Sequence, residues 1–394
     1  MPWNKLREKH EGVPAMFTLL LSLSLLVWLA VFMDASFGFN RLDRLEDAES
    51  TSVGPRLSVI VAARNEEARL EQSLKSQLEQ SYKRIEWILV NDRSADKTGE
   101  IMDWMQESDS RIRTIHIDSL PDGWLGKNHA LYKGYCESTG ELILFTDADV
   151  LFKKEAISKA IHYFNHHKLD HLTAAPNLNG KSFWLKAFIA FFLFGFSYYK
   201  RPWLANNPSS KTGMGIGAFN LISKQAYEVL GTHEVIKMRP DDDLMLGMKI
   251  KQKGFRQRIV TAMNLIEVEW YGSLKEAFKG LEKNTFAGLH YRISMVLFAI
   301  AGTFISQVLP FATIFSPDKI ISGLSLANIL LLAIVYTIIT KRMSAFSPLL
   351  FLVFPITALL FIYSIIRASI LTLVRGGIVW RGTLYKLSEL RGKH

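Results

Sequence analysis

Two carboxylates stand two residues apart at Asp147 and Asp149, and only Thr146 separates them from the apolar run Leu142–Phe145. Side chains two positions apart on an extended segment face the same way, so we expect both carboxylates to converge on one hard cation. Mg²⁺ and Mn²⁺ prefer oxygen ligands and usually keep coordination places for water and phosphate oxygens. This pair, with Ala148 between its members, predicts a metal site that could bind a diphosphate and neutralise charge on a leaving group.

A second acidic cluster consists of Asp241, Asp242 and Asp243, which follow Pro240. Such a sequence fits a helix N-terminus, where proline is tolerated and the helix dipole favours negative charge. However, three adjacent carboxylates repel one another, and a helix start needs only one of them. A carboxylate whose proton affinity is raised by its neighbours can act as a general base toward a hydroxyl group. We therefore expect this cluster to supply a catalytic base.

The segment Asp122–Leu131 contains Gly126, which permits a tight turn, and Lys127, which would open a helix. The amides at a helix N-terminus favour anions, so a lysine there can form an ion pair with a diphosphate. The alternative is a solvated surface lysine. We expect His129, two residues later, to have a structural role.

Polar residues also follow the first two expected strands. The first strand ends at Ala63, and Arg64, Asn65 and Glu66 follow it; these four residues lie where an α/β sheet of this kind binds its ligand, here the expected nucleotide. After the second strand comes Asp92, a carboxylate that disfavours phosphate but can accept hydrogen bonds from a ribose or a pyrimidine ring. The alternative is that Ser94 or Asp96 merely caps the following helix, and we expect Asp96 to be that cap.

A glycine-rich stretch, Thr212–Phe219, superficially resembles a dinucleotide-binding loop. It leads into an expected strand and not into a helix, which argues against that interpretation. We expect Gly215 and Gly217 to let an acceptor molecule approach the backbone.

Alternating apolar runs and helical spacings predict the elements that must position these residues. The expected strands are Leu57–Ala63, Ile85–Val90, Arg111–Ile117 and Glu141–Phe145, and the expected helices are Asn65–Gln80, Thr98–Met105 and Lys127–Glu137. Continuous apolar strands separated by helices indicate a doubly wound, mostly parallel α/β sheet with right-handed crossovers. Ligands of such sheets bind beyond the carboxyl ends of the strands, where the polar residues described above follow.

Four runs without any charged residue are each long enough to cross a hydrocarbon layer of about 30 Å as a helix. They are Ala15–Met33, Ile293–Pro317, Ile320–Thr340 and Met343–Ile366. The first run could be a cleaved signal peptide, but a retained anchor is our expectation. Four spans would put both termini opposite a cytoplasmic catalytic domain, whereas basic residues such as Arg375, Arg381 and Lys393 favour the cytoplasm. Either one run does not cross, or Ala368–Val379 re-enters the membrane.

The net charge of +10 fits the excess of basic residues found beside membranes. The sequence lacks the basic, aromatic-rich module typical of nucleic-acid binding. A single cysteine, Cys136, excludes an internal disulfide and suits a domain in the reducing cytosol.

These patterns predict four parts: an N-terminal membrane anchor (1–40), a linker (41–56), a catalytic α/β domain (57–291), and C-terminal transmembrane helices with a basic tail (292–394). Within the third part, the aromatic segment Phe183–Tyr199 could be a core helix or a helix lying in the membrane interface.

With these motifs in this order, the sequence resembles the glycosyltransferase family 2 enzymes, which have a GT-A fold, over about Leu57 to Tyr291. The motifs that carry the resemblance are Ser58–Glu67, Val90–Thr98, Phe145–Asp149 and the pair Asp242-Asp243. The resemblance implies that Asn65, Glu66 and Asp92 hold the nucleoside of a donor. It also implies that Asp147 and Asp149 hold the metal and diphosphate. Asp243 would be the base of an inverting single displacement, because Gly254 follows it at the family's interval.

Two departures from the family pattern bear on the function. The acidic pair is usually Glu-Asp, so the base could be Asp242. The processive members carry a Gln/Arg-x-x-Arg-Trp motif, and the corresponding stretch here, Gly280–Asn284, keeps a basic residue at Lys283 but no tryptophan. Other motifs, Gly123–Leu131 and Asn284–Leu289, look like the branch that acts on carotenoid- and hopanoid-type lipids.

The sequence therefore predicts a multi-pass cell-membrane enzyme with a cytoplasmic catalytic domain. The expected reaction is transfer of one hexose from a nucleotide sugar, with a UDP-sugar favoured, to a lipid or lipid-linked acceptor, dependent on Mg²⁺ or Mn²⁺. The alternatives are a processive polysaccharide synthase and a non-catalytic nucleotide-binding membrane scaffold.

Overall fold

The computed structural model describes residues 2–380 and 383–391, so Arg381 and Lys393 of the basic tail lie outside the described residues. The chain divides into two compact units. The sheet unit contains Asn40–Asn179 and Pro202–Trp270. The helical unit contains the N-terminal residues up to Phe39, Gly180–Arg201 and Tyr271–Arg391. The four predicted part boundaries stay predictions. The two units are defined by contacts, and these group residues 180–201 and 271–291 with the helices.

The sheet unit is built on an eight-stranded sheet in the described part of the chain, with the order β3-β2-β1-β4-β7-β6-β8-β5. The strands are β1 (Leu57–Ala63), β2 (Ile85–Asp92), β3 (Ile112–Ile117), β4 (Leu142–Asp147), β5 (Val150–Phe152), β6 (His171–Asn179), β7 (Asn220–Ser223) and β8 (Gln257–Glu269). Strands β3, β2, β1 and β4 run parallel, as do β6 and β8, whereas β7 is antiparallel to both β4 and β6. The predicted mostly parallel α/β fold is confirmed, and the four predicted strands lie close to their predicted bounds.

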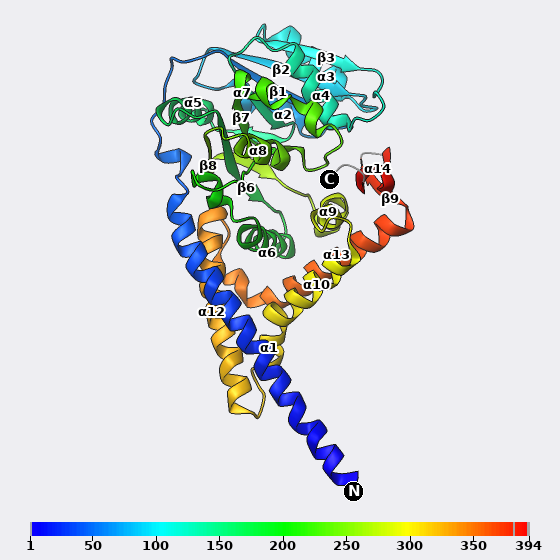
Figure 1. The fold of residues 1–394 in the computed structure, drawn as a ribbon. Helices are drawn as coiled ribbons and strands as arrows, with labels where there is room; N and C mark the ends of the chain where they lie inside the picture. Colours follow the sequence, from blue (N-terminus) through cyan, green and yellow to red (C-terminus); the bar gives the residue numbers. More distant parts are fainter. Residues whose placement is uncertain (1, 381–382, 392–394) are drawn as a thin grey trace. The chain divides into compact units, whose positions relative to one another are not determined.

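Helices cover both faces of this sheet (Figure 1). One face carries α2 (Leu70–Leu78), α3 (Thr98–Ser108) and α5 (Ala156–His166), and the other carries α4 (Gly126–Cys136), α7 (Lys224–Leu230) and α8 (Asp242–Gln252). Val59 and Val61 of β1 pack into the first layer, and Ile60 and Ala62 pack into the second. This alternation follows from the period of two along a strand, so both faces of β1 must be apolar.

The residues of the predicted linker pack on the sheet unit. Leu45 is fully buried, and Arg44 forms a parallel bridge with Thr261 of β8. The Asp43 carboxylate accepts hydrogen bonds from the Tyr163 hydroxyl (2.5 Å) and from Arg258 (2.8 Å). Residues that look solvated in the sequence are therefore fixed by partners more than a hundred positions away.

Among its described residues, the helical unit contains four segments that are long and apolar enough to cross a membrane. They are Val13–Arg41, whose last two residues belong to the sheet unit, Ile293–Thr313, Lys319–Met343 and Pro348–Val374. Its α-helices are α1 (Pro2–Gly38), α6 (Phe183–Lys200), α9 (Leu274–Gly288), α10 (Ile293–Thr303), α11 (Leu309–Thr313), α12 (Lys319–Met343), α13 (Phe354–Val374) and α14 (Leu387–Arg391). Strands β9 (Gly377–Trp380) and β10 (Thr383–Lys386) pair antiparallel. Four predicted spans thus correspond to four helical segments, and their orientation stays a prediction.

The aromatic segment between β6 and β7 forms α6, a buried helix of the helical unit. Phe188 packs against Phe278 of α9, and Phe191 packs against Phe354 and Phe361 of α13. These contacts support the core-helix alternative.

Polar contacts inside the helical unit join helix α1 to α12 and to the segment that follows α10. The buried Asn328 side chain accepts a hydrogen bond from Ser24 (2.7 Å) and donates one to the carbonyl of Leu21 (3.0 Å). The Trp28 indole donates to the carbonyl of Ser306 (3.2 Å). Specific packing of this kind favours a retained anchor over a cleaved signal peptide.

Candidate active site

The two aspartates after β4 do not share one extended segment. The strand ends at Asp147, and Ala148 and Asp149 form a turn that reverses the chain into β5, which pairs with β8. The predicted extended geometry of this pair is therefore wrong. The reason is that β5 must reach the far edge of the sheet immediately after β4 ends.

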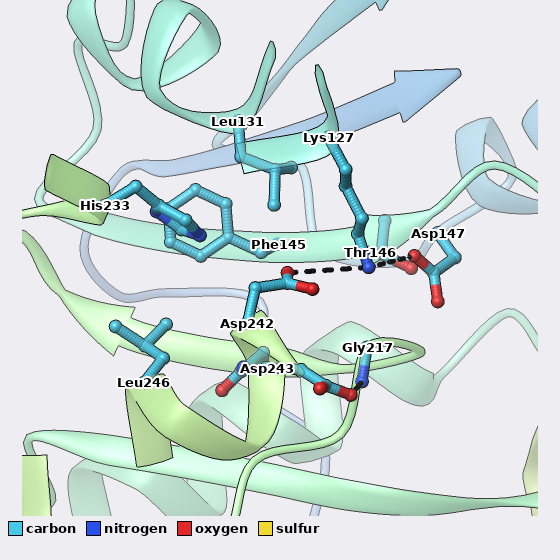
Figure 2. Close-up of a pocket in the computed structure, with 11 residues that line it drawn as sticks. Lys127, Leu131, Phe145, Thr146, Asp147, Gly217, His233, Asp242, Asp243 and Leu246 are labelled. Carbon is cyan, nitrogen blue, oxygen red and sulfur yellow. Dashed lines mark hydrogen bonds and ion pairs between the residues drawn. The ribbon is translucent and has the colours of Figure 1, made fainter. Parts of the chain in front are cut away.

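A small cavity lies where β4, α4 and α8 meet (Figure 2). Its polar wall consists of four charged residues and four others: Lys127, Asp147, Asp242, Asp243, Thr146, Gly217, Asn220 and His233. Its apolar wall includes Leu131, Phe145 and Leu246. The structure therefore brings together one member of the first acidic pair and two members of the second cluster, although about a hundred residues separate them in the chain.

Lys127 lies between the two acidic groups at the start of α4 (Figure 2). Its Nζ is 2.8 Å from Asp147 Oδ1 and 3.5 Å from Asp242 Oδ2, and its side chain is only 19% exposed. Burial alone would lower the pKa of Lys127, but the surrounding carboxylates outweigh burial and raise it. Lys127 is therefore a charged, buried side chain, and the solvated surface alternative does not describe it.

Asp243 is held by two backbone amides in the first turn of α8. Gly217 N–H donates to Oδ2 (2.7 Å), and Leu244 N–H donates to Oδ1 (2.7 Å). Burial raises the pKa of Asp243, although the nearby charge of Lys127 opposes this. A carboxylate with raised proton affinity in a cavity is suited to accept a proton.

The other two members of the cluster have different surroundings. Asp242 begins α8, is buried, and faces Lys127. Asp241 is paired with Arg239 (2.8 Å) and is not among the residues that line the cavity. The helix begins at Asp242, as the proline and acids of this segment predicted.

Gly217 connects the two acidic groups through its backbone. Its carbonyl accepts a hydrogen bond from the Asp147 N–H (3.1 Å), and its own N–H donates to Asp243. A Cβ at Gly217 would lie 2.6 Å from Asp147 Oδ2, and one at Gly215 would lie 1.9 Å from the Asp243 carbonyl oxygen. The glycines thus allow α8 to approach the chain closely, and their contact with an acceptor stays a prediction.

Replacing Gly217 with alanine is expected to reduce turnover about 10- to 100-fold, because the new methyl group must push the Asp147 carboxylate aside. The measurement is the initial rate of transfer in washed membranes at saturating substrate. Gly288→Ala is the matched control, because a Cβ at Gly288 meets nothing within 4 Å. Equal rates for both variants would show that Asp147 does not need its present position.

Asn128 holds the segment that leads into the acidic cluster. Its buried amide donates to the carbonyls of Ile236 (2.9 Å) and Arg239 (3.0 Å), and Leu125 N–H donates to the carbonyl of Lys237 (2.8 Å). These bonds fix the approach to α8 against the start of α4. The sequence did not indicate this role, since its only signal is an amide next to Lys127.

His129 packs edge-on against Trp124 inside the same motif. Burial lowers its pKa, and the side chain does not line the cavity. This environment agrees with the structural role predicted for it.

The loops after β1 and β2 are bound to each other. The Asn65 side chain accepts a hydrogen bond from Ala95 N–H (2.8 Å), and Glu66 N–H donates to the Thr98 hydroxyl (2.8 Å). Asp96 accepts a hydrogen bond from Thr98 N–H (3.0 Å) at the start of α3, but the N-cap position itself is occupied by Lys97, so the predicted cap is displaced by one residue. Asn65 adopts a positive φ of 56°, a conformation that asparagine tolerates better than most residues.

Asp92 lies beside the start of α4. It is buried and paired with Arg93 (2.8 Å), and a Cβ at Gly126 would come within 2.4 Å of its Oδ2. The donor-side residues that do not line the cavity are Ala63, Arg64, Asn65, Glu66, Asp92 and Ala148. Their contacts with a nucleoside stay predictions. Lys283 lies on α9, and its side chain is outside the described structure.

A buried hydrogen-bond network supports the glycine-rich stretch from below. Gln257 Nε2 donates to His171 Nδ1 (2.9 Å), and Gln257 Oε1 accepts from Met214 N–H (2.9 Å). The remaining ring nitrogen, Nε2, must then carry the proton that is donated to Asn220 Oδ1. Burial lowers the pKa of His171 to about 4, so the ring is neutral in the folded chain.

This neutral histidine predicts that the chain loses stability as the pH falls. The folded-state pKa of about 4 is lower than the ordinary value of 6.5. The stabilisation is therefore complete above pH 6.5 and is lost as the pH falls toward 4, by about 3 kcal/mol at most. Thermal unfolding midpoints of the purified chain at pH 7.5 and pH 5 test this prediction.

His171→Gln should flatten that pH dependence, because glutamine keeps a donor and an acceptor but does not titrate. Part of the dependence should persist, because burial also lowers the pKa of His233, to about 3. An unchanged pH profile in His171→Gln would contradict the neutral, hydrogen-bonded ring.

Asp147 and Asp149 fit a metal that completes its coordination with other ligands. Among the described residues, no group of three or more histidine, cysteine, aspartate or glutamate side chains could hold a metal by itself. Mg²⁺ and Mn²⁺ need no such cage, since they commonly bind one or two carboxylates plus phosphate oxygens and water. Around the cavity, the three acids Asp147, Asp242 and Asp243 outnumber the single ammonium of Lys127. The residues present therefore suit a divalent cation held jointly with a diphosphate.

Comparisons with known proteins bear on the family and the fold of this chain. A family model described as "Glycosyl transferase family 2" matches residues 58–231. The 4,4'-diaponeurosporenoate glycosyltransferase of Staphylococcus haemolyticus (strain JCSC1435) is 36% identical over 119 residues, which is 30% of this chain and 30% of that protein. The probable glycosyltransferase YdaM of Bacillus subtilis (strain 168) is 38% identical over 105 residues, 26% of this chain and 25% of its own length.

Two further similarities extend over most of the chain. The 4,4'-diaponeurosporenoate glycosyltransferase of Staphylococcus aureus (strain N315) is 23% identical over 361 residues, 89% of this chain and 94% of that protein. Among solved structures, the mannosyltransferase PcManGT from Pyrobaculum calidifontis, in complex with GDP-Man and Mn²⁺, aligns with a TM-score of 0.50 and 16% identity. That alignment covers 90% of this chain and 99% of that one, and it supports the GT-A fold.

Proposed function

Because this chain is a family 2 glycosyltransferase, we propose that it transfers one hexose from a nucleotide-diphosphate sugar to a membrane lipid, with inversion at the anomeric carbon. The observation that carries this proposal is the cavity that joins Asp147, Lys127 and Asp243. It combines groups suited to a diphosphate with a carboxylate suited to a proton, in one place.

The residues divide the reaction between them. Asp243 takes the proton of the acceptor O–H, the acceptor oxygen bonds to the anomeric carbon, and the sugar's bond to the diphosphate breaks with its electron pair. Lys127 pairs with the negative charge that the departing diphosphate gains. Asp147 and Asp149 would hold Mg²⁺ or Mn²⁺, which would supply further charge neutralisation at the leaving group.

The donor and the acceptor are inferred from the residues at the strand ends, the similar proteins and the membrane helices. We favour a UDP-sugar, with Asn65, Glu66 and Asp92 at the nucleoside, while a similar solved structure binds GDP-Man. The similar staphylococcal proteins are named 4,4'-diaponeurosporenoate glycosyltransferases, and the described part of this chain carries four helices that are long and apolar enough to cross a membrane. A hydroxyl or carboxyl group of a membrane lipid therefore fits as the acceptor, with the catalytic part on the cytoplasmic side.

Washed membranes that contain the full chain test this proposal. They are incubated with radiolabelled UDP-glucose, UDP-galactose or GDP-mannose, with Mn²⁺ or with EDTA, and the lipid extract is separated by thin-layer chromatography. We expect one discrete labelled lipid from one donor, and no product in EDTA. A ladder of long products would instead indicate a polysaccharide synthase, and no product from any donor would argue against lipid glycosylation.

A further inference from the structure

Both carboxylates of the Asp147/Asp149 pair already face a basic side chain from elsewhere in the sheet unit. Lys127 Nζ lies 2.8 Å from Asp147 Oδ1, and Arg69 Nη1 lies 3.6 Å from Asp149 Oδ2. One cation comes from the start of α4, and the other comes from the residue that precedes α2. The two oxygens that would serve a metal are therefore paired with cations that belong to the chain itself.

Each of these cations also has a second anionic partner. Lys127 is 3.5 Å from Asp242, and Arg69 donates to the carbonyl of Glu269 (2.8 Å) and pairs with its carboxylate (3.0 Å). Either side chain can therefore leave its aspartate without becoming an unpaired charge in a partly buried place. Moving either cation away from its aspartate therefore costs much less free energy than leaving the same charge unpaired in a partly buried place.

A divalent cation and an ammonium group compete for one carboxylate, because each repels the other at contact distance. We propose, on the basis of the metal site in the proposed function, that Lys127 and Arg69 are resident cations of the donor-free enzyme. They occupy Asp147 and Asp149 until a metal replaces them. The donor-free enzyme then binds metal weakly, and a diphosphate that draws Lys127 away from Asp147 strengthens metal binding.

Lys127 could instead serve only to hold the cavity in shape, and this role predicts the opposite effect on metal binding. If Lys127 only braces the cavity, its loss leaves Asp147 poorly placed and weakens metal binding. If Lys127 occupies the metal's position, its loss removes a competitor and tightens metal binding. Lys127 should have the larger effect, since its contact with Asp147 is shorter than that of Arg69 with Asp149.

The test is a titration of the purified full chain in nanodiscs with Mn²⁺ alone, without nucleotide. Free Mn²⁺ is followed by its electron paramagnetic resonance signal. We expect Lys127→Met to bind Mn²⁺ about tenfold tighter than the unmodified chain, and Arg69→Met about threefold tighter. Lys133→Met is the matched control, because Lys133 lies on the same helix α4 with an exposed side chain, and its affinity should not change.

If the Lys127→Met chain folds poorly without metal, thermal unfolding with and without Mn²⁺ still measures its metal binding. Mn²⁺ should raise the unfolding midpoint of Lys127→Met more than that of the unmodified chain, because tighter binding to the folded state stabilises it more. Equal or weaker Mn²⁺ affinity in both Lys127→Met and Arg69→Met would overturn the proposal while leaving the metal site intact. If Asp149→Asn binds Mn²⁺ as the unmodified chain does, the metal site itself is wrong.

Discussion

Asp243→Asn is expected to reduce turnover about 1,000-fold and to leave the KM for the donor nearly unchanged. Asparagine keeps an oxygen that can accept the Gly217 N–H, so the first turn of α8 and the cavity should persist. What disappears is the ability to take a proton from the acceptor. The measurement is single-turnover transfer at saturating donor and acceptor in washed membranes.

Two controls separate the base from its neighbours. Asp241→Asn should retain activity within a few fold, because Asp241 pairs with Arg239 outside the cavity. Asp242→Asn tests the alternative assignment, since Asp242 lines the same cavity and faces Lys127. A large loss in Asp242→Asn together with a small loss in Asp243→Asn would move the base by one residue.

The pH profile gives an independent check on the same side chain. The base must be ionised to act, so activity falls as the pH drops through the pKa of Asp243. Burial raises this pKa above the ordinary 3.8, so the acidic limb of the rate profile should lie above that value. The limb should disappear from the residual activity of Asp243→Asn.

Asp149→Ala is expected to reduce the rate of transfer about 1,000-fold. The remaining activity should no longer respond to added Mn²⁺. Alanine removes a carboxylate that the proposed function assigns to the metal, and Arg69 is left with Glu269 as its partner. The measurement is the rate across a range of Mn²⁺ concentrations. Asp118→Ala removes an exposed acid as the matched control and should behave as the unmodified chain does.

Survival of metal-stimulated transfer in Asp149→Ala would show that the metal is held elsewhere. The cavity geometry around Lys127 and Asp243 would then need another explanation for its excess of negative charge.

Most of the parallel half of the fold is readable from the sequence because strands β1, β2 and β4 are almost continuously apolar and buried. All seven residues of β1 are buried, and β4 follows the same rule until Asp147. The other half offers no such signal. In β8, polar side chains such as Gln257, Thr261 and Glu267 interrupt the apolar ones, because the strand binds a buried histidine at one end and the segment before β1 along its side.

The candidate site shows the same division. The types and order of Asp147, Lys127 and Asp243 indicate chemistry, and the doubly wound fold indicates the sheet edge on which they gather. Their connection through the Gly217 backbone could not be predicted, because it depends on how closely α8 packs against a stretch of chain. The turn at Ala148 also depends on pairings between distant residues, and so do the hydrogen bonds from Asn128 to the segment before α8.

The central claim is that acids from two distant parts of the chain act around one diphosphate. A cryo-electron microscopy map of the full chain in nanodiscs, with a nucleotide sugar and Mn²⁺, tests it most directly. We expect density for the metal against Asp147 and Asp149, with the diphosphate beside Lys127 and the Asp243 carboxylate facing the sugar's anomeric carbon. Nucleotide density away from Lys127, or an Asp243 carboxylate that opens onto a different cavity from the sugar, would contradict the account.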